Sequence, residues 1–286
     1  MGHTTDYLVK MARDITSCPN SREMDMLLAT GEQVSIALLT MAIQAQGYAA
    51  VSMNAMQVGI ITECVHSKAR IVDIKTNKLK EHLDKGEIIV VAGFQGVTPD
   101  GEITTLGRGG SDTSAVAIAG AMNADRCDIY TDVEGVYTTD PRIVPCATKL
   151  KEISYEEMLE LAHVGANVLH PRSVETAKQY QVPLRVRSTF KLDDLGTYII
   201  GVDEMEIYKP VAGVASDLSQ IRVVITEVPD RPGNAAKIFE MLSKSDISVD
   251  MIIQSYGRSD DTNDIAFTVC RSDYERTMEL VKDIIK

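Results

Sequence analysis

The chain lacks most of the features that indicate nucleic-acid binding, disulfides or zinc. It has no tryptophan, and its 29 lysines and arginines are outnumbered by 41 aspartates and glutamates, which gives a net charge of −12. Negative charge of this size repels polyanions, so we expect no nucleic-acid partner. The five cysteines form no CxxC pair and have no histidine at metal-ligand spacing, which disfavours a zinc site and a disulfide framework.

Signals for membranes and for export are also missing from the pattern. Residues 1–6 show no basic segment followed by an apolar one, and we expect no apolar stretch long enough to span a bilayer. We therefore predict a cytoplasmic protein that does not contact membranes. At 286 residues the chain is long enough for two moderate domains.

Helical and strand patterns alternate through the first two thirds of the chain. This alternation predicts a doubly wound α/β fold, a three-layer αβα domain with a mostly parallel sheet. The predicted helices are 6–13, 22–46, 77–85, 111–124, 154–163 and 173–179, and the predicted strands are 49–53, 69–73, 87–92, 127–131 and 183–187.

A second pattern follows a charged, weakly periodic stretch at 203–209, and we place the domain boundary there, giving domains 1–205 and 206–286. The second domain has the order βαββα, which matches a ferredoxin-like domain with one terminal strand absent. Its predicted elements are a strand at 221–227, a helix at 234–243, strands at 249–256 and 264–270, and a helix at 273–285.

Residues 106–114, Leu-Gly-Arg-Gly-Gly-Ser-Asp-Thr-Ser, form the most informative stretch. Glycines let backbone N–H groups approach an anion, and a helix beginning near Asp112 adds its positive end. Arg108 can hold a carboxylate or phosphate by two parallel hydrogen bonds, while Asp112 can orient a metal or a cationic group. The alternative is an ordinary turn in which Ser111 or Asp112 caps the next helix.

A second polar cluster, residues 131–142, follows the predicted strand at 127–131. Loops that follow strands of an open parallel sheet converge on one crevice. Thr131 and Asp132 offer hydrogen bonds to a base or ribose, Tyr137 offers a flat face, and Arg142 offers charge to a phosphate tail. A turn with a capping aspartate before Pro141 remains the alternative.

In the order of these motifs, the chain resembles the aspartate kinases of the amino acid kinase family over nearly its whole length. The ordered matches are Gly-His-Thr-Thr-Asp at 2–6, Thr-Gly-Glu-Gln-Val-Ser at 30–35, Gln-Val-Gly-Ile-Ile-Thr at 57–62, Ala-Gly-Phe-Gln-Gly at 92–96, the segments 104–112 and 131–142, and Val-Leu-His-Pro-Arg at 168–172.

The resemblance implies that MgATP donates its γ-phosphoryl group to the β-carboxylate of L-aspartate, giving 4-phospho-L-aspartate for lysine, threonine and methionine biosynthesis. The carboxylate is already a nucleophile, so alignment and charge neutralisation are the protein's task. The implied aspartate-binding residues are Thr4, Glu32, Arg108, Ser111 and Asp112, of which Arg108 and Asp112 are catalytic, and the implied ATP-binding residues are Thr131, Asp132, Tyr137 and Arg142.

Glu32 is expected to pair with the α-ammonium of the substrate, although an exposed helix carboxylate is the ordinary alternative. No histidine is assigned a catalytic role, and His170 before Pro171 is expected to be a structural turn residue. No protein group is assigned as a metal ligand, so Mg²⁺ is expected to enter with ATP.

The chain departs from the family at two places. The Lys-Phe-Gly-Gly strand and loop with which the family opens does not occur, and Asn167 stands where many relatives have a lysine. We therefore expect a truncated chain with impaired catalysis. The alternative is a non-catalytic regulatory chain that binds an amino acid and partners an intact kinase.

The second domain resembles an ACT domain, notably in Pro-Asp-Arg-Pro-Gly-Asn-Ala-Ala at 229–236 and Met-Ile-Ile-Gln at 251–254. By this resemblance Asp230, Gly233, Ala235 and Gln254 are expected to bind a lysine or threonine effector. An ordinary capped turn is the alternative at 229–236. Because family members pair two ACT domains, we expect a homodimer or higher oligomer formed through this domain.

Overall fold

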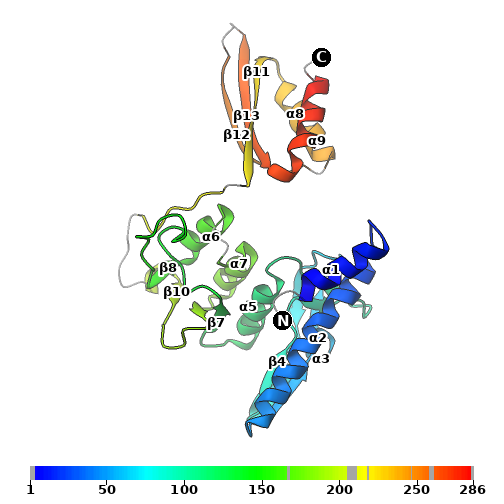
Figure 1. The fold of residues 1–286 in the computed structure, drawn as a ribbon, viewed down its shortest axis with the longest axis vertical. Helices are drawn as coiled ribbons and strands as arrows, with labels where there is room; N and C mark the ends of the chain where they lie inside the picture. Colours follow the sequence, from blue (N-terminus) through cyan, green and yellow to red (C-terminus); the bar gives the residue numbers. More distant parts are fainter. Residues whose placement is uncertain are drawn as a thin grey trace. The chain divides into compact units, whose positions relative to one another are not determined.

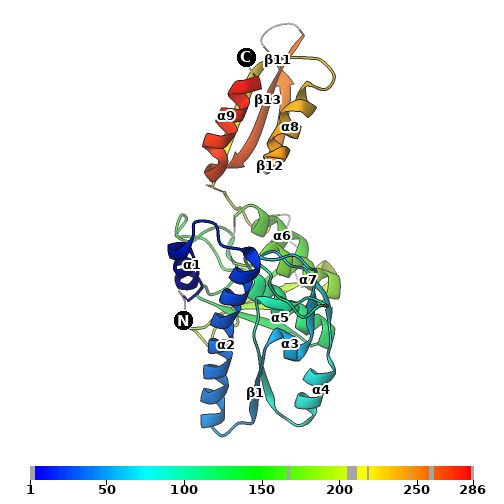
Figure 2. The same ribbon diagram turned by 90° about the vertical axis from the view of Figure 1, so that its right-hand side faces the viewer.

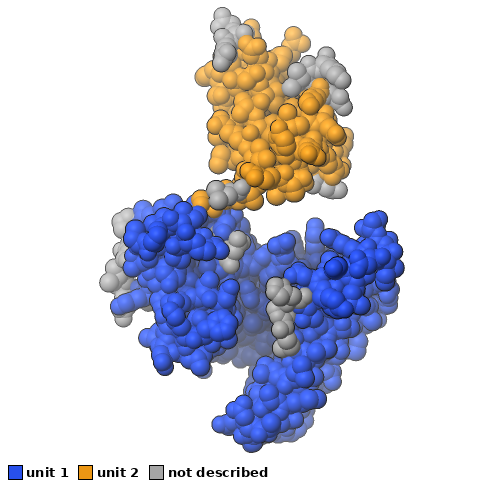
Figure 3. All heavy atoms as spheres, viewed as in Figure 1, with its two compact units in different colours: residues 1–215 blue, residues 216–286 orange. Residues whose placement is uncertain are grey.

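The chain folds into two compact units. The structure, a computed structural model, describes residues 4–165, 168–204, 211–217, 219–245, 247–257 and 261–284. Figure 1 shows its elements and Figure 3 colours the two units, residues 1–215 and 216–286. The boundary predicted between residues 205 and 206 falls outside the described residues.

Two helices open the first unit, α1 (Thr4–Ile15) and α2 (Ser21–Ala45). The side chain of Asn20 caps α2 by accepting a hydrogen bond from the Arg22 N–H, and the helix ends just before Gly47, which has a φ of 87°. The helix α2 packs beside the first strand of the unit, as Figure 2 shows.

By length and composition alone, α2 is apolar enough to cross a membrane, and it is the one such helix among the described residues. The sequence-based statement that no stretch reaches this length was therefore wrong. The reason is that Glu32 interrupts the run without making the whole segment polar. The same helix carries the fully buried Asp25 and packs on strands of the first unit, but only 17% of its apolar 18-residue window is buried.

Parallel pairs form the centre of the first unit. The strands β1 (Ala50–Met53) and β4 (Ile88–Val91) pair in parallel, as do β7 (Cys127–Thr131) and β9 (Leu184–Ser188). The helix α4 (Asn77–Asp84) precedes β4 in the sequence, and α5 (Gly110–Met122) precedes β7 and packs on it. The helix predicted at 111–124 is α5, which begins one residue earlier than predicted.

A second, mixed sheet has the order β3-β2-β5-β6. Its strands are β2 (Ile60–Thr62), β3 (Ile71–Ile74), β5 (Gln95–Val97) and β6 (Ile103–Thr105), and the one-turn helix α3 (Ala55–Val58) precedes β2. The sequence patterns predicted β3 but not the other three strands. The pair β5 and β6 is an antiparallel hairpin that positions the loop after Thr105.

The remaining elements of the first unit complete the sheet around β9. Here β8 (Glu152–Ser154) and β10 (Thr197–Ile200) extend it to the order β7-β9-β10-β8, and a short 3-10 turn, η1 (Val202–Glu204), follows. The helices α6 (Tyr155–His163) and α7 (Pro171–Tyr180) cover it. A Ser154 and Glu157 capping box begins α6, and Pro171 at the first turn begins α7.

The second unit is the predicted βαββα arrangement. It contains β11 (Gln220–Pro229), α8 (Asn234–Lys244), β12 (Val249–Tyr256), β13 (Thr262–Cys270), the 3-10 turn η2 (Arg271–Asp273) and α9 (Tyr274–Ile284). The antiparallel sheet has the order β11-β13-β12, and Phe267 of its central strand packs in the core with Ile238 and Leu242 of α8. The predicted fold class, a mixed α/β domain followed by a ferredoxin-like domain, is confirmed.

Candidate active site

A cavity of about 520 Å³ in the first unit is lined by most of the residues predicted to bind the substrate. Glu32 reaches it from α2, and Arg108, Ser111 and Asp112 reach it from the loop and first turn of α5. The other lining residues are Thr5, Met24, Leu28, Ser67, Phe94, Thr105, Gly107, Gly109 and Gly110. Residues from distant parts of the sequence therefore share one site.

The three glycines of the loop at 107–110 lie where a side chain would meet a neighbour. Gly109 has a φ of 65°, and a Cβ added there would lie 2.1 Å from the Cβ of His170. A Cβ on Gly110 would lie 2.9 Å from the Phe94 ring. The backbone thus passes close to two neighbours and enters α5 with its N-terminus at the cavity, where the positive end of the helix favours an anion.

Arg172 holds the same loop from the side of α7. Its Nη1 donates to the carbonyl oxygen of Leu106 at 2.7 Å, and its Nη2 donates to that of Ala69 at 3.1 Å. Leu106 is buried, so its carbonyl depends on a protein donor. His170, predicted to be a structural turn residue, lies against Gly109, and Arg172 hydrogen-bonds to the loop that carries Arg108.

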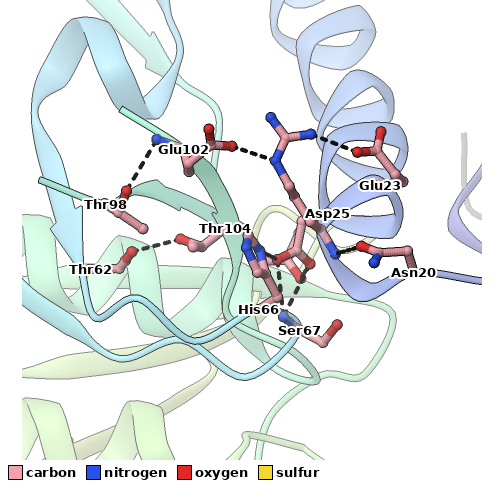
Figure 4. A network of polar contacts seen from close by, with 11 residues as sticks. Asn20, Glu23, Asp25, Thr62, His66, Ser67, Thr98, Glu102 and Thr104 are labelled. Carbon is pink, nitrogen blue, oxygen red and sulfur yellow. Dashed lines mark hydrogen bonds and ion pairs between the residues drawn. The ribbon is translucent and has the colours of Figure 1, made fainter. Parts of the chain in front are cut away.

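A stripe of α2 holds the opposite wall of the cavity against the hairpin of β5 and β6. Arg22 donates to Glu102 at 2.7 Å, Asp25 accepts from Thr105 at 2.6 Å, and the carbonyl of Ala29 accepts from Gln95 at 3.3 Å. Figure 4 shows Asp25 and Glu102, the acceptors of two of these bonds. Glu32 is three residues after Ala29, so it continues the same helical stripe into the cavity.

Burial changes the pKa of the two carboxyl groups that line the cavity. Glu32 and Asp112 are each half-buried, and loss of hydration raises the pKa of both above their ordinary values. Each therefore gains from a cation placed beside it. Arg108, in contrast, is exposed.

The residues predicted to bind ATP lie elsewhere in the unit, on the segment after β7. None of the four is among the described residues that line the cavity. Thr131 ends β7, and its hydroxyl donates to the Asp132 carboxylate at 3.1 Å. Tyr137 is half-buried, and its backbone pairs with that of Lys149 in an isolated antiparallel β-bridge. Arg142 extends into solvent with 86% of its side chain exposed and donates to Asp140 at 2.7 Å, which lowers the pKa of that carboxyl.

Sequence reasoning missed several residues of the cavity wall. Thr4, the predicted contact, lies 3.2 Å from where a Cβ on Gly31 would be, whereas its neighbour Thr5 lines the cavity. Phe94 has a φ of 65°, rare outside glycine, and its N–H donates to the Ser114 hydroxyl at 3.1 Å. Its place between two glycines in the motif at 92–96 was the available signal.

In the second unit the predicted effector residues do not all meet. Asp230 and Gly233 lie in the turn between β11 and α8, and Ala235 lies in the first turn of α8. Gly233 has a φ of 94°, and the Asn234 side chain donates to the Pro229 carbonyl at 2.9 Å. Gln254 is on β12, which β13 separates from β11. Asn167 lies outside the described residues.

Comparison with known proteins agrees with this architecture. A sequence model of the amino acid kinase family matches residues 1–188, and a model of the ACT domain matches residues 221–284. The chain therefore belongs to the amino acid kinase family, with an ACT domain following the kinase domain.

The relatives narrow the class further. Aspartokinase 2 of Bacillus subtilis is 53% identical over 283 residues, which cover 99% of this chain and 69% of that protein. An aspartokinase of Geobacillus stearothermophilus is 51% identical over 282 residues with the same coverage. At this level of identity the chain is placed among the aspartokinases.

Solved structures give the same placement. Aspartate kinase from Synechocystis is 45% identical with a TM-score of 0.62, and the match covers 99% of this chain and 48% of that one. E. coli aspartokinase III in complex with aspartate and ADP is 28% identical with a TM-score of 0.75, covering 93% of this chain and 59% of that one. The chain thus spans about half to two thirds of the length of these relatives.

Proposed function

We propose that the chain is an aspartate kinase that transfers the γ-phosphoryl group of MgATP to the β-carboxylate of L-aspartate. The observation that carries the proposal is the single cavity lined by Glu32, Arg108, Ser111 and Asp112. It combines one cation, two carboxyls and a helix N-terminus, which suits a small zwitterion with a second carboxylate.

The aspartate would lie with a carboxylate on the Arg108 guanidinium and the amides of the loop, and with its ammonium near Glu32. Burial removes water from the Glu32 and Asp112 carboxylates and raises the pKa of both groups. A substrate ammonium beside them would replace the lost hydration and stabilise their charged forms. The β-carboxylate oxygen attacks the γ-phosphorus, the bond to the bridging oxygen of ADP breaks, and ADP leaves with the electron pair. Arg108 and the α5 N-terminus offset the repulsion between two anions.

The nucleotide is proposed to bind along the segment after β7. Thr131 and Asp132 would hydrogen-bond the ribose or base, Tyr137 would stack, and Arg142 would exchange its bond to Asp140 for a phosphate oxygen. Mg²⁺ is proposed to enter as part of MgATP.

The test is a coupled assay of ADP release with hydroxylamine present to trap the acyl phosphate as a hydroxamate. Hydroxamate that depends on L-aspartate, ATP and Mg²⁺, and that glutamate does not replace, supports the proposal. Binding of an amino acid without any turnover would favour the alternative, a regulatory chain that partners an intact kinase.

The second unit is proposed to bind lysine or threonine and to pair with another ACT domain, giving a homodimer or larger assembly. In support of this, E. coli aspartokinase III has been solved in complex with lysine and aspartate, and the chain covers 60% of that protein at 27% identity. The exposed apolar side chains of β12, an edge strand, offer a pairing surface. A cytoplasmic location remains our expectation.

A further inference from the structure

Asp25 is a buried carboxylate near the cavity, and both of its oxygens accept hydrogen bonds. Its side chain has no exposure, and it accepts from three groups on two other segments of the chain. His66 Nδ1 donates to it at 2.8 Å, the Ser67 N–H at 3.0 and 3.2 Å, and the Thr105 hydroxyl at 2.6 Å. Figure 4 shows Asp25 directed from α2 toward His66 and Ser67.

These partners are part of the cavity or adjoin it. Ser67 and Thr105 line the cavity, and a Cβ on Gly107 would lie 2.9 Å from the Ser67 carbonyl oxygen. Asp25 is also two helical turns before Glu32 on the same face of α2. One carboxylate therefore links the helix that carries Glu32 to the strand end and loop that precede Arg108.

We propose that Asp25 is a positioning residue: it fixes the spacing between Glu32 and the loop that carries Arg108, and so sets the affinity for the amino-acid substrate. This inference rests on the proposed function for its substrate. Removing one charged acceptor leaves the Ser67 N–H or the Thr105 hydroxyl poorly paired, and α2 is then free to shift against the loop.

The experiment compares Asp25→Asn with Glu87→Gln in the full chain. The control is matched, because Glu87 also accepts a hydrogen bond from a histidine Nδ1, that of His82, but it lies just after α4 and is not among the residues that line the cavity. The readouts are Kd for L-aspartate and for MgATP by calorimetry, Tm, and amide hydrogen exchange of residues 105–112 without ligand.

We expect Asp25→Asn to raise the Kd for L-aspartate about tenfold and to leave that for MgATP within about twofold. Exchange at 105–112 should increase in Asp25→Asn and stay at the wild-type level in Glu87→Gln. Should Asp25→Asn fail to fold, Thr105→Val carries the same test, and Thr105→Ser, which keeps the hydroxyl, should restore the wild-type values.

Two outcomes would overturn the inference. One is a lower Tm in Asp25→Asn with exchange at 105–112 no faster than in Glu87→Gln, which would make Asp25 merely structural. The other is full additivity of Asp25→Asn and Thr105→Val, because a hydroxyl that acts through Asp25 has nothing left to lose in its absence. Hydrogen exchange needs no ligand, so it decides the role of Asp25 even if the wild type binds no aspartate and the proposed function fails.

Discussion

The two halves of the proposed active site differ in how far they are organised without ligand. On the amino-acid side, Glu32, Arg108, Ser111 and Asp112 line one cavity. Its walls are held by the hydrogen bond that Asp25 accepts from Thr105 and by the one that Arg172 donates to the Leu106 carbonyl. On the nucleotide side, Thr131 and Asp132 bond to each other, and Arg142 bonds to Asp140 in solvent. Rigid support on one side and a segment that must exchange its bonds on the other predict different responses to mutation.

The largest effect is expected for Arg108, because its charge is placed where two anions must meet. Arg108→Ala should lower kcat/KM for aspartate by about 100-fold or more, since the cation that offsets the repulsion between the two anions is lost. Steady-state kinetics with varied aspartate measures this loss, and the circular dichroism spectrum should be unchanged because the side chain is exposed. An unaltered kcat/KM would remove Arg108 from the site.

Arg172 tests the support of the cavity rather than its contacts with substrate. Arg172→Ala leaves the buried Leu106 carbonyl without its donor, and we expect a loss of about 1–3 kcal/mol of stability together with a higher KM for aspartate. Urea denaturation and kinetics on the same sample measure both. Lys178→Ala is the control on the same helix, because it breaks an exposed ion pair with Glu156 of α6 and should change neither quantity appreciably.

Arg142 probes the nucleotide side. Arg142→Ala should raise KM for ATP about tenfold and leave KM for aspartate unchanged, because a charged hydrogen bond to phosphate is lost. The control Asp140→Asn releases Arg142 from its present partner and should lower KM for ATP or leave it unchanged. A rise in KM for aspartate with Arg142→Ala would show that the two halves are not separate in function.

The same contrast explains what the sequence predicted well. Segments with local signals were placed within a few residues: the Ser154 and Glu157 capping box begins α6, and the apolar run at 87–92 contains β4. The glycine-rich loop at 107–110 indicated the cavity because its residue types are constrained by backbone geometry.

The missed elements depend on contacts distant in sequence. The hairpin of β5 and β6 is three residues per strand, and its buried Gln95, Thr104 and Thr105 resemble a polar loop. They are buried because each finds a partner far along the chain: Gln95 donates to Ala29, Thr104 pairs with Thr62 at 2.6 Å, and Thr105 donates to Asp25. Asp25 was missed for the same reason, since a single aspartate on a helix has no local signal for burial.

The smallest effect concerns the cost of keeping Glu32 charged in the cavity. Burial raises the pKa of Glu32 above its ordinary value of 4.5, so between that value and the raised one the folded protein binds a proton that the unfolded chain has released. This group therefore favours folding fully below pH 4.5, and its contribution is lost as the pH rises through the raised pKa.

Glu32→Gln removes this cost, so without substrate its Tm at pH 7 should exceed that of the wild type by roughly 1 to 3 °C. The difference should shrink as the pH is lowered toward 4.5, where the wild-type carboxyl becomes neutral. Calorimetric scans at several pH values measure it, with Glu160→Gln on the exposed side of α6 as the control that should show no such gain. A lower stability of Glu32→Gln than of the wild type at pH 7 would contradict this expectation. It would mean that a partner in the free protein stabilises charged Glu32 by more than burial destabilises it, so that the amino-acid side, like the nucleotide side, has its polar groups paired with one another before ligand binds.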